Sequence, residues 1–309
     1  MRLATRGSAL ALTQARLVTR LLEQAEPGLR VELLTVRTAG DERSASGSER
    51  PDAGDDKSRW VREIERALLD GRADLAVHSA KDVPGELPEG LAIVGVPARG
   101  DPRDSLCGAR SLERLERGAP VGTSSLRRRA QLLAARPDLR VEDQRGNVDT
   151  RLRQLEHGRY AAIVLAQAGL ARLGRTDGAP LDPESMTPAP GQGCLALEAR
   201  STDAAAGALA RRVEDAPAAR CLAAERTLVR ALGASCRTPM GAYAEHVQGR
   251  LRLSAFVGRP DGSEWIRDVL DGSPDEPVAL GLALAERLRL AGAEPLLAAA
   301  EAAMGAGAT

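Results

Sequence analysis

The sequence predicts an α/β protein in which two α/β lobes, joined by two hinge crossings, precede a small C-terminal α+β domain. Three observations support this fold class. Strand and helix patterns alternate through residues 1–98, alternate again through 101–190, and change from about Asp215 to one helix followed by three successive strands. Alternation favours parallel sheets with crossover helices. A chain of 309 residues is long enough for two or three such domains.

Lobe 1 is predicted from residues 1–98 together with 193–212. One helix begins near Ser8, whose side chain suits the N-cap position, and another runs from Trp60 to Leu69. The polar stretch 41–59 contains no core-forming residue and is expected to be a mobile loop or lid. Strands are expected at 2–5, 30–37, 74–79, 91–97 and, rejoining the lobe after the second crossing, 194–200.

Lobe 2 is predicted from residues 101–190, and the C-terminal α+β domain from 215–309. In lobe 2, helices are expected over 124–135 and around 147–158, between the strands VGTSS, LRVED and AAIVLA. The two crossings fall near 98–101 and 190–194, and two-lobed proteins of this kind bind ligands between their lobes. In the C-terminal domain, a helix ending at Leu232 precedes the strands MGAYAEH, GRLRLSAFVG and EWIRDVL, and two Ala/Leu-rich helices follow.

The composition argues against several classes of protein. The 43 basic and 43 acidic residues cancel, and two Trp, two Tyr and one Phe are too few for a platform on which nucleic-acid bases stack. No stretch approaches the roughly 18 apolar residues of a membrane span, and Arg6 and Arg16 interrupt the N-terminal apolar run. Three scattered histidines and four distant cysteines predict neither a metal site nor a disulfide framework. We therefore expect a cytoplasmic protein with reduced cysteines.

Arginines recur where predicted strands lead into helices. The segment GTSSLRR places Thr123, Ser125, Arg127 and Arg128 at a helix start, where backbone N–H groups and guanidinium groups suit a carboxylate or phosphate. Similar junctions are RGNVDTR, with Arg145 and Arg151, ATRGS, with Arg6 and Ser8, and AGLARLG, with Arg172. Each arginine alone is more typical of a solvated surface charge. Their recurrence at strand ends, where α/β proteins bind ligands, favours a ligand with several negative charges.

Two further segments could carry chemistry. HSAKDVP follows an apolar strand, so Lys81 and Asp82 are expected at its carboxyl end, where a carboxylate can stabilise a developing cation. The alternative is an aspartate that merely begins a turn before Pro84. In GASCRTPMGAY, Cys236 lies in a loop among small residues, and core packing does not explain it. The remaining cysteines, Cys107, Cys194 and Cys221, fall in strand or helix patterns typical of buried thiols.

Taken in order, these segments resemble the porphobilinogen deaminase family. The resemblance runs from LATRGSALALTQA through HSAKDVP, DPRDSL, VGTSSLRRRAQL, RGNVDTRL, AGLARLG and PAPGQG to GASCRTPMGAYAE, over nearly the whole chain. It implies two lobes similar to periplasmic binding proteins and a third domain. It also implies an enzyme of tetrapyrrole biosynthesis, acting as a monomer. The implied reaction joins four porphobilinogen molecules head to tail, with release of ammonia, into hydroxymethylbilane.

The resemblance also implies roles for individual residues. Cys236 would hold a dipyrromethane cofactor through a thioether, and Asp82 would contact pyrrole nitrogens and stabilise the cation left when ammonia departs. The groups implied to hold carboxylates of cofactor and substrate are Ser79, Lys81, Thr123, Ser125, Arg127, Arg128, Arg145 and Arg151. Those implied to face the substrate or the growing chain are Arg6, Ser8, Gln14 and Arg172. The planar fork of arginine suits carboxylates bidentately.

The sequence departs from the family pattern in two places. Ala234-Ser235 stands where the family has Gly-Gly before the cofactor cysteine. In the lid segment AGDDKSRW, Lys57 and Trp60 fit the family pattern, but Ala53 replaces a second lysine. Two alternatives therefore stay open: a non-catalytic two-lobe protein that binds small anions, and an inactive member of the family.

Overall fold

The computed structural model describes residues 1–36, 58–234 and 238–306, with side chains from 61 onward in the second range and up to 300 in the last. Residue contacts divide the chain into two compact units. The first unit comprises Met1–Gly100 with Gly193–Arg220, and the second comprises Asp101–Gln192 with Cys221–Thr309. Among the described residues, no helix combines the length and apolar character needed to cross a bilayer.

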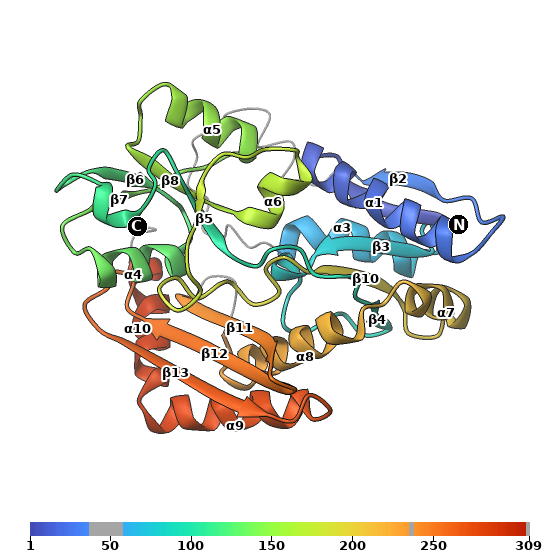
Figure 1. Cartoon of the computed structure of the whole chain (residues 1–309). Coiled ribbons are helices and arrows are strands. Elements are labelled where there is room, and N and C mark those ends of the chain that lie inside the picture. Colours follow the sequence, from blue (N-terminus) through green and yellow to red (C-terminus); the bar gives the residue numbers. More distant parts are fainter. Residues whose placement is uncertain (37–57, 235–237, 307–309) are drawn as a thin grey trace. The chain divides into compact units, whose positions relative to one another are not determined.

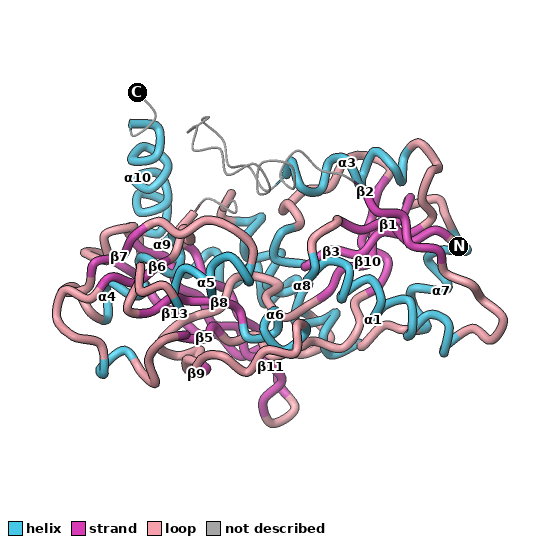
Figure 2. The backbone as a smooth tube through the Cα atoms, turned by 90° about the horizontal axis from the view of Figure 1, so that it is seen from above, coloured by secondary structure: helices cyan, strands magenta, loops and turns pink. Residues whose placement is uncertain are grey.

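The first unit is built on a mixed sheet with the strand order β2-β1-β3-β10-β4. Its strands are β1 (Arg2–Arg6), β2 (Glu32–Val36), β3 (Leu75–Ser79), β4 (Leu91–Gly95) and β10 (Leu195–Arg200). Helices α1 (Ala9–Ala25) and α3 (Ser58–Leu69) lie on opposite faces of this sheet, as Figure 2 shows, and α7 (Ala204–Arg212) packs beside α1. The short 3-10 turn η1 (Ala80–Asp82) follows β3 directly.

Alternation along the strands explains why both faces of this sheet are covered. Leu3 belongs to the apolar cluster shared with α1, whereas its neighbour Ala4 belongs to the cluster shared with α3. Successive strand side chains point to opposite faces, so apolar residues at both positions require a helix layer on each side.

The second unit contains another mixed sheet, with the order β7-β6-β8-β5-β9. Its strands are β5 (Asp104–Cys107), β6 (Pro120–Gly122), β7 (Arg140–Glu142), β8 (Ala162–Ala166) and β9 (Ala179–Pro180). The helices of this part are α4 (Leu126–Ala135), α5 (Val148–Glu156) and α6 (Gln167–Arg172), with a 3-10 turn η2 (Leu112–Arg114). Ser125 and Asn147 cap α4 and α5 through their side-chain oxygens.

An antiparallel sheet, two helices and the part of a third helix from Cys221 onward complete the second unit (Figure 1). The strands are β11 (Met240–Val247), β12 (Arg250–Gly258) and β13 (Trp265–Gly272), and the helices are α8 (Ala216–Ala231), α9 (Pro277–Leu290) and α10 (Ala293–Ala306). Alternate residues of β11 and β12 form one apolar cluster with all three helices. The sheet also contacts α4, and Gly262 packs tightly against the backbone of Leu133 and Ala134.

The predicted fold class, with two α/β sheets and a C-terminal α+β part, is confirmed, and residues 195–200 do rejoin the first sheet. The strand and helix alternation predicted parallel sheets, whereas both sheets are mixed. Leu195 begins β10 opposite Ser79, at the carboxyl end of β3, and Asp104 begins β5 opposite Ala166, at the carboxyl end of β8. A strand that enters a sheet at that edge must run back along its neighbour, so β10 and β5 are antiparallel.

Candidate active site

A small pocket of about 70 Å³ lies in the first unit, where β1 and β3 end. Neighbouring parallel strands place their carboxyl ends at one edge of a sheet, which is where α/β proteins bind ligands. The lining brings together most of the residues predicted for this lobe: Arg6, Ser8, Gln14, Ser79 and Asp82. The other lining residues are Leu10, Ala11, Val61, Val77 and His78.

Local hydrogen bonds hold this pocket in shape. Ser8 is the N-cap of α1, and its Oγ accepts a hydrogen bond from the N–H of Ala11 at 3.3 Å. The buried side chain of Gln14 donates from Nε2 to the Oγ of Ser79 at 2.9 Å, which ties α1 to the end of β3. The N–H of Ala80 donates to the carbonyl of Cys194 at 3.1 Å. The turn that contains Lys81 and Asp82 is therefore held in place at its first residue, and both side chains are partly exposed.

His78 was not singled out in the sequence although it lines the same pocket. Its imidazole is buried, and Nε2 lies 2.9 Å from Oε2 of Glu198, which is fully buried on β10. Glu65 on α3 is also buried, and burial, followed by the charge of Glu198, raises its pKa to about 7. No local pattern announces this group, because its three members come from segments far apart in the sequence.

In the second unit, Arg127 and Arg128 lie in the first turn of α4 and are buried. Both guanidinium groups donate to Asp104, which is fully buried at the start of β5. Arg127 Nη1 lies 2.7 Å from Oδ2, while Arg128 Nε and Nη2 lie 3.0 and 2.7 Å from Oδ1. Although burial opposes ionisation, the two guanidinium groups hold the pKa of Asp104 well below its usual range.

The two arginines are used differently by the protein. Arg128 also donates from Nη1 to the carbonyl of Val164 at 2.7 Å, so all three of its guanidinium nitrogens have protein acceptors. Within the described residues, the Arg127 side chain donates through Nη1 alone, to Asp104 and to the carbonyl of Thr187. The prediction that Arg128 binds cofactor carboxylates stays a prediction.

Two glutamines extend this network. Gln192 donates from Nε2 to Asp104 at 3.0 Å and to the carbonyl of Pro102 at 2.8 Å. Gln131 donates to the carbonyl of Thr187 at 3.0 Å and accepts from the N–H of the same residue at 2.7 Å. The DPRDSL motif contains Asp104, but the sequence does not show which arginines it contacts.

The other predicted residues occupy various environments. Thr123 is buried, and its Oγ1 accepts from the N–H of Ser125 at 3.2 Å. Arg145 is exposed, and Arg151 is half-buried with Nε donating to the carbonyl of Gly146 at 2.8 Å. Arg172 ends α6 and is half-buried. Lys57 and Cys236 lie outside the described residues, and Trp60 is placed in α3 without its side chain being described.

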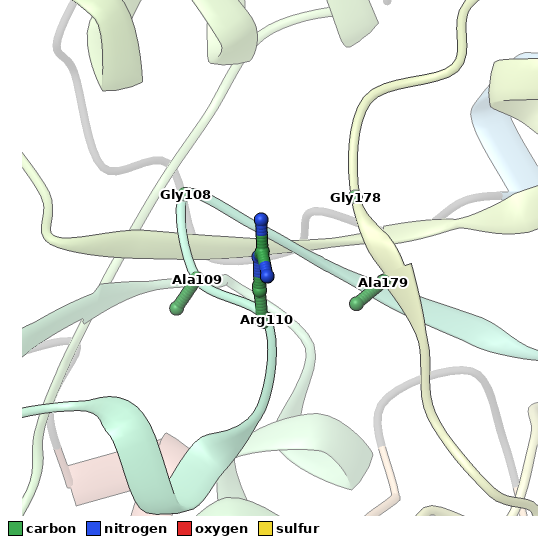
Figure 3. A pocket seen from close by; sticks show the side chains of 5 residues that line it. All are labelled: Gly108, Ala109, Arg110, Gly178 and Ala179. Atoms are coloured by element: carbon green, nitrogen blue, oxygen red, sulfur yellow. The ribbon is translucent and has the colours of Figure 1, made fainter.

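A larger pocket of about 340 Å³ lies elsewhere in the second unit and contains none of the predicted residues. Its lining is Gly108, Ala109, Arg110, Gly178 and Ala179, and Figure 3 shows the Arg110 side chain between the two segments. One cation among glycines and alanines provides no acid, base or nucleophile, so this pocket is not the candidate active site.

Comparisons with known proteins identify the family of this chain. Residues 1–208 match the family model described as "Porphobilinogen deaminase, dipyromethane cofactor binding domain", and 219–289 match "Porphobilinogen deaminase, C-terminal domain". A porphobilinogen deaminase of Thermus thermophilus is 46% identical over 301 residues, which cover 95% of this chain and 97% of that protein. One of Methylobacillus flagellatus is 43% identical and covers 96% of each chain.

Among solved structures, immunogenic lipoprotein A of Vibrio vulnificus is similar with a TM-score of 0.43 and 11% identity, over 71% of this chain and 96% of that one. The matched models span far more than half of the sequence, and the relatives exceed 40% identity over almost its full length. The chain belongs to the porphobilinogen deaminase family.

Proposed function

We propose that Asp82 is the catalytic carboxylate with which this chain performs the reaction of its family. The enzyme is a transferase that condenses four porphobilinogen molecules into hydroxymethylbilane and releases ammonia. The observation that carries the proposal is the pocket at the end of β3, where Asp82 lies with Arg6, Gln14 and Ser79. This pocket combines a carboxylate for a cation with a guanidinium for an anion.

The chemistry needs both kinds of group. When the C–N bond of the protonated aminomethyl group breaks, ammonia leaves with the electron pair, and a cation conjugated with the pyrrole ring remains. A carboxylate beside this cation stabilises it most when the charge has developed, near the transition state. Bound dipyrromethane would supply the free α-carbon for the new C–C bond, and Asp82 would accept the proton released from that carbon. The acetate and propionate groups of each pyrrole need cationic partners, and Arg6 is one at this pocket.

The residues of the second unit fit an anionic cofactor. The buried group at α4 contains two guanidinium cations and one carboxylate, so it carries an excess positive charge. Arg127 keeps Nε and Nη2 without an acceptor among the described residues, whereas Arg128 does not. We assign carboxylate binding to Arg127, and a positioning role to Arg128. When bound, the dipyrromethane supplies the primer pyrrole with a free α-carbon.

The remaining assignments follow the family motif. Cys236 is proposed as the point of covalent attachment. Further carboxylate contacts are proposed for Ser79, Lys81, Thr123, Ser125, Arg145 and Arg151, and contacts to the substrate or growing chain for Arg6, Ser8, Gln14 and Arg172. The hydroxyl groups and guanidinium forks of these residues are donors, which suits carboxylate ligands.

Substitution of Asp82 tests the proposal. Asp82→Asn keeps the size of the side chain but removes its charge, so the folded, cofactor-loaded protein should turn over orders of magnitude more slowly. Asp82→Glu should keep partial activity, and Asp70→Asn, at an exposed aspartate of the same unit, should behave as the parent. Single-turnover kinetics give the rate, and intact-protein mass gives the cofactor content and, in Cys236→Ser, the bare chain. Condensation by Asp82→Asn at the parent rate would show that Asp82 is only a turn residue.

The same mass measurement separates the alternatives. A small-anion binder would carry no dipyrromethane, and an inactive family member would carry it without turnover. We also propose a cytoplasmic monomer with domains at 1–98 with 193–212, 101–190 and 215–309. Unit limits at 100/101 and 192/193, and a separate apolar cluster around β11 and β12, support these boundaries. Light scattering of the purified protein would give its oligomeric state.

A further inference from the structure

Three ionisable side chains meet inside the first unit without a role in the reaction described above. Glu65 comes from α3, His78 from β3 and Glu198 from β10, and each is at most 5% exposed. In the antiparallel register, Glu198 pairs with Ala76 and His78 pairs with Ala196, so His78 and Glu198 are diagonal neighbours on one face of the sheet. The same face is covered by α3, because Ala76 packs in one cluster with Ile64 and Leu68.

This group reaches the pocket through two of its members. His78 itself lines the pocket beside Asp82. Val61 lines it too, and Glu65 follows Val61 by one turn on the same side of α3. The cluster therefore lies against the wall of the pocket that is proposed to bind a polycarboxylate chain.

The charges of the cluster do not balance when every carboxyl group is ionised. Among the described residues, Oε1 of Glu65 and Oε1 of Glu198 have no hydrogen-bond donor, and Oε2 of Glu198 lies 2.9 Å from Nε2 of His78. A buried carboxylate without a donor is costly, so such a group tends to hold a proton instead. The arrangement is not a metal site, since no group of three His, Cys, Asp or Glu in the described part of the chain is suitably placed.

Few other charges face Glu65. On the elements packed against α3, the ionisable residues are Arg2 and Arg6 on β1, His78 on β3, Lys81 and Asp82 on η1, and Glu198 and Arg200 on β10. Arg2 is paired with Asp74, and Arg200 with Asp203. Burial and Glu198 raise the pKa of Glu65, while the charges of His78 and Arg62 oppose this change without cancelling it.

We propose that Glu65, buried beside His78 and Glu198, holds a proton near neutral pH, and that its ionisation lowers the affinity of the Asp82 pocket for its anionic substrate. The proposal rests on the function proposed above. Ionisation of Glu65 adds a negative charge next to a pocket that is proposed to bind carboxylates. It should therefore raise KM more than it changes kcat. Glu65 and Glu198 are thus positioning residues, which act through the potential at the pocket.

The sign of the stability change follows from the same geometry. The pKa of Glu65 is about 7 in the folded chain, above its ordinary value, so the folded state holds a proton that the unfolded state has released. Folding stability should therefore fall as pH rises from about 4.5 through about 7. Replacing Glu65 by a residue that does not titrate should remove this part of the decrease in folding stability.

Glu65→Gln tests the cluster, and Glu63→Gln is the matched control, because Glu63 lies on the same helix but is partly exposed. The first readout is Tm against pH without substrate, which needs no catalytic activity. We expect Glu65→Gln to lose much of the decline between about pH 5 and 8, and Glu63→Gln to keep it. The second readout is KM against pH, which should rise several-fold above about pH 7 in the parent and in Glu63→Gln, and stay flat in Glu65→Gln.

Each outcome bears on one claim. An unchanged Tm profile in Glu65→Gln would overturn the proposal that Glu65 holds this proton, whatever the catalytic activity of the variant. A flattened Tm profile with an unchanged KM profile would overturn the effect on substrate affinity. Failure to form any tetrapyrrole would overturn the proposed function and leave the Tm result standing. As a further check, His78→Gln should lower Tm more than the double variant His78→Gln/Glu198→Gln, because the double variant leaves no unpaired carboxylate at Glu198.

Discussion

Asp104 offers the sharpest test of the buried network, because one substitution removes the carboxylate that pairs with both Arg127 and Arg128. The carboxylate is fully buried and accepts hydrogen bonds from Arg127, Arg128 and Gln192 at 2.7–3.0 Å. Asp104→Asn would place an amide donor against these donors and leave two buried guanidinium groups without a counter-charge. Breaking a buried pair in this way costs about 3–5 kcal/mol. For a unit of this size, that is a fall in Tm of roughly 6–20 °C.

The same motif supplies the control for this experiment. Asp101 pairs with Arg103 through a hydrogen bond of 2.6 Å, but the two side chains are 28% and 43% exposed. Asp101→Asn should therefore cost only about 0–1 kcal/mol. Urea unfolding at neutral pH, followed by circular dichroism, would give both values by linear extrapolation.

The loss of folding stability at low pH is a second test of the role of Asp104. Its pKa is held low in the folded state, so its contribution is present above the ordinary carboxyl pKa and is lost as pH falls below that value. The parent and Asp104→Asn should converge in stability below about pH 4. Equal and small losses in Asp104→Asn and Asp101→Asn at neutral pH would refute the argument that burial makes the difference.

Two further predictions concern residues with matched partners. Arg127→Leu should impair cofactor loading or elongation by the loss of a charge-assisted contact, about 1.5–3 kcal/mol, whereas Arg128→Leu should mainly lower Tm. Intact mass and thermal unfolding are measured on both variants. If the two variants behave alike, the different roles assigned to Arg127 and Arg128 are wrong. Gly193→Ala should destabilise the protein by at least about 1–3 kcal/mol, because φ is +90° and the added Cβ would lie 2.4 Å from the carbonyl oxygen of Gly100. Gly174→Ala, at φ +67° with open space around the Cβ, should cost only about 1–2 kcal/mol in the same unfolding assay.

Sequence patterns predicted what is local in this fold. Ser8 caps α1 and Ser125 caps α4, as the position of small hydroxyl residues before apolar helices indicates. The strand that begins at Leu195 could be assigned to the first sheet because its apolar run follows a Pro/Gly-rich crossing. Its direction could not be predicted, because strand direction depends on the edge at which the chain re-enters the sheet, and no residue pattern records that.

Sequence patterns could not predict the contacts between distant segments. His78 and Glu198 lie on strands that are neighbours in the sheet but remote in the chain. Nothing in the sequence of either segment indicates that the two side chains are in contact. Asp104 appears in a recognised motif, yet its four donors come from α4 and from the second crossing. A motif can therefore mark a residue as important while leaving its partner unknown.

The arginines show how structure divides residues that the sequence treats alike. All but two of the 43 basic residues are arginine, so the presence of an arginine at a strand end says little. What separates them is how many guanidinium nitrogens the protein itself uses. Arg128 and Arg136 donate from all three, to carboxylates and backbone carbonyls, and a ligand could bind either one only by breaking protein contacts. Arg127 uses one nitrogen, so of the two arginines that contact Asp104 it is the one that can bind a carboxylate while the network around Asp104 stays intact.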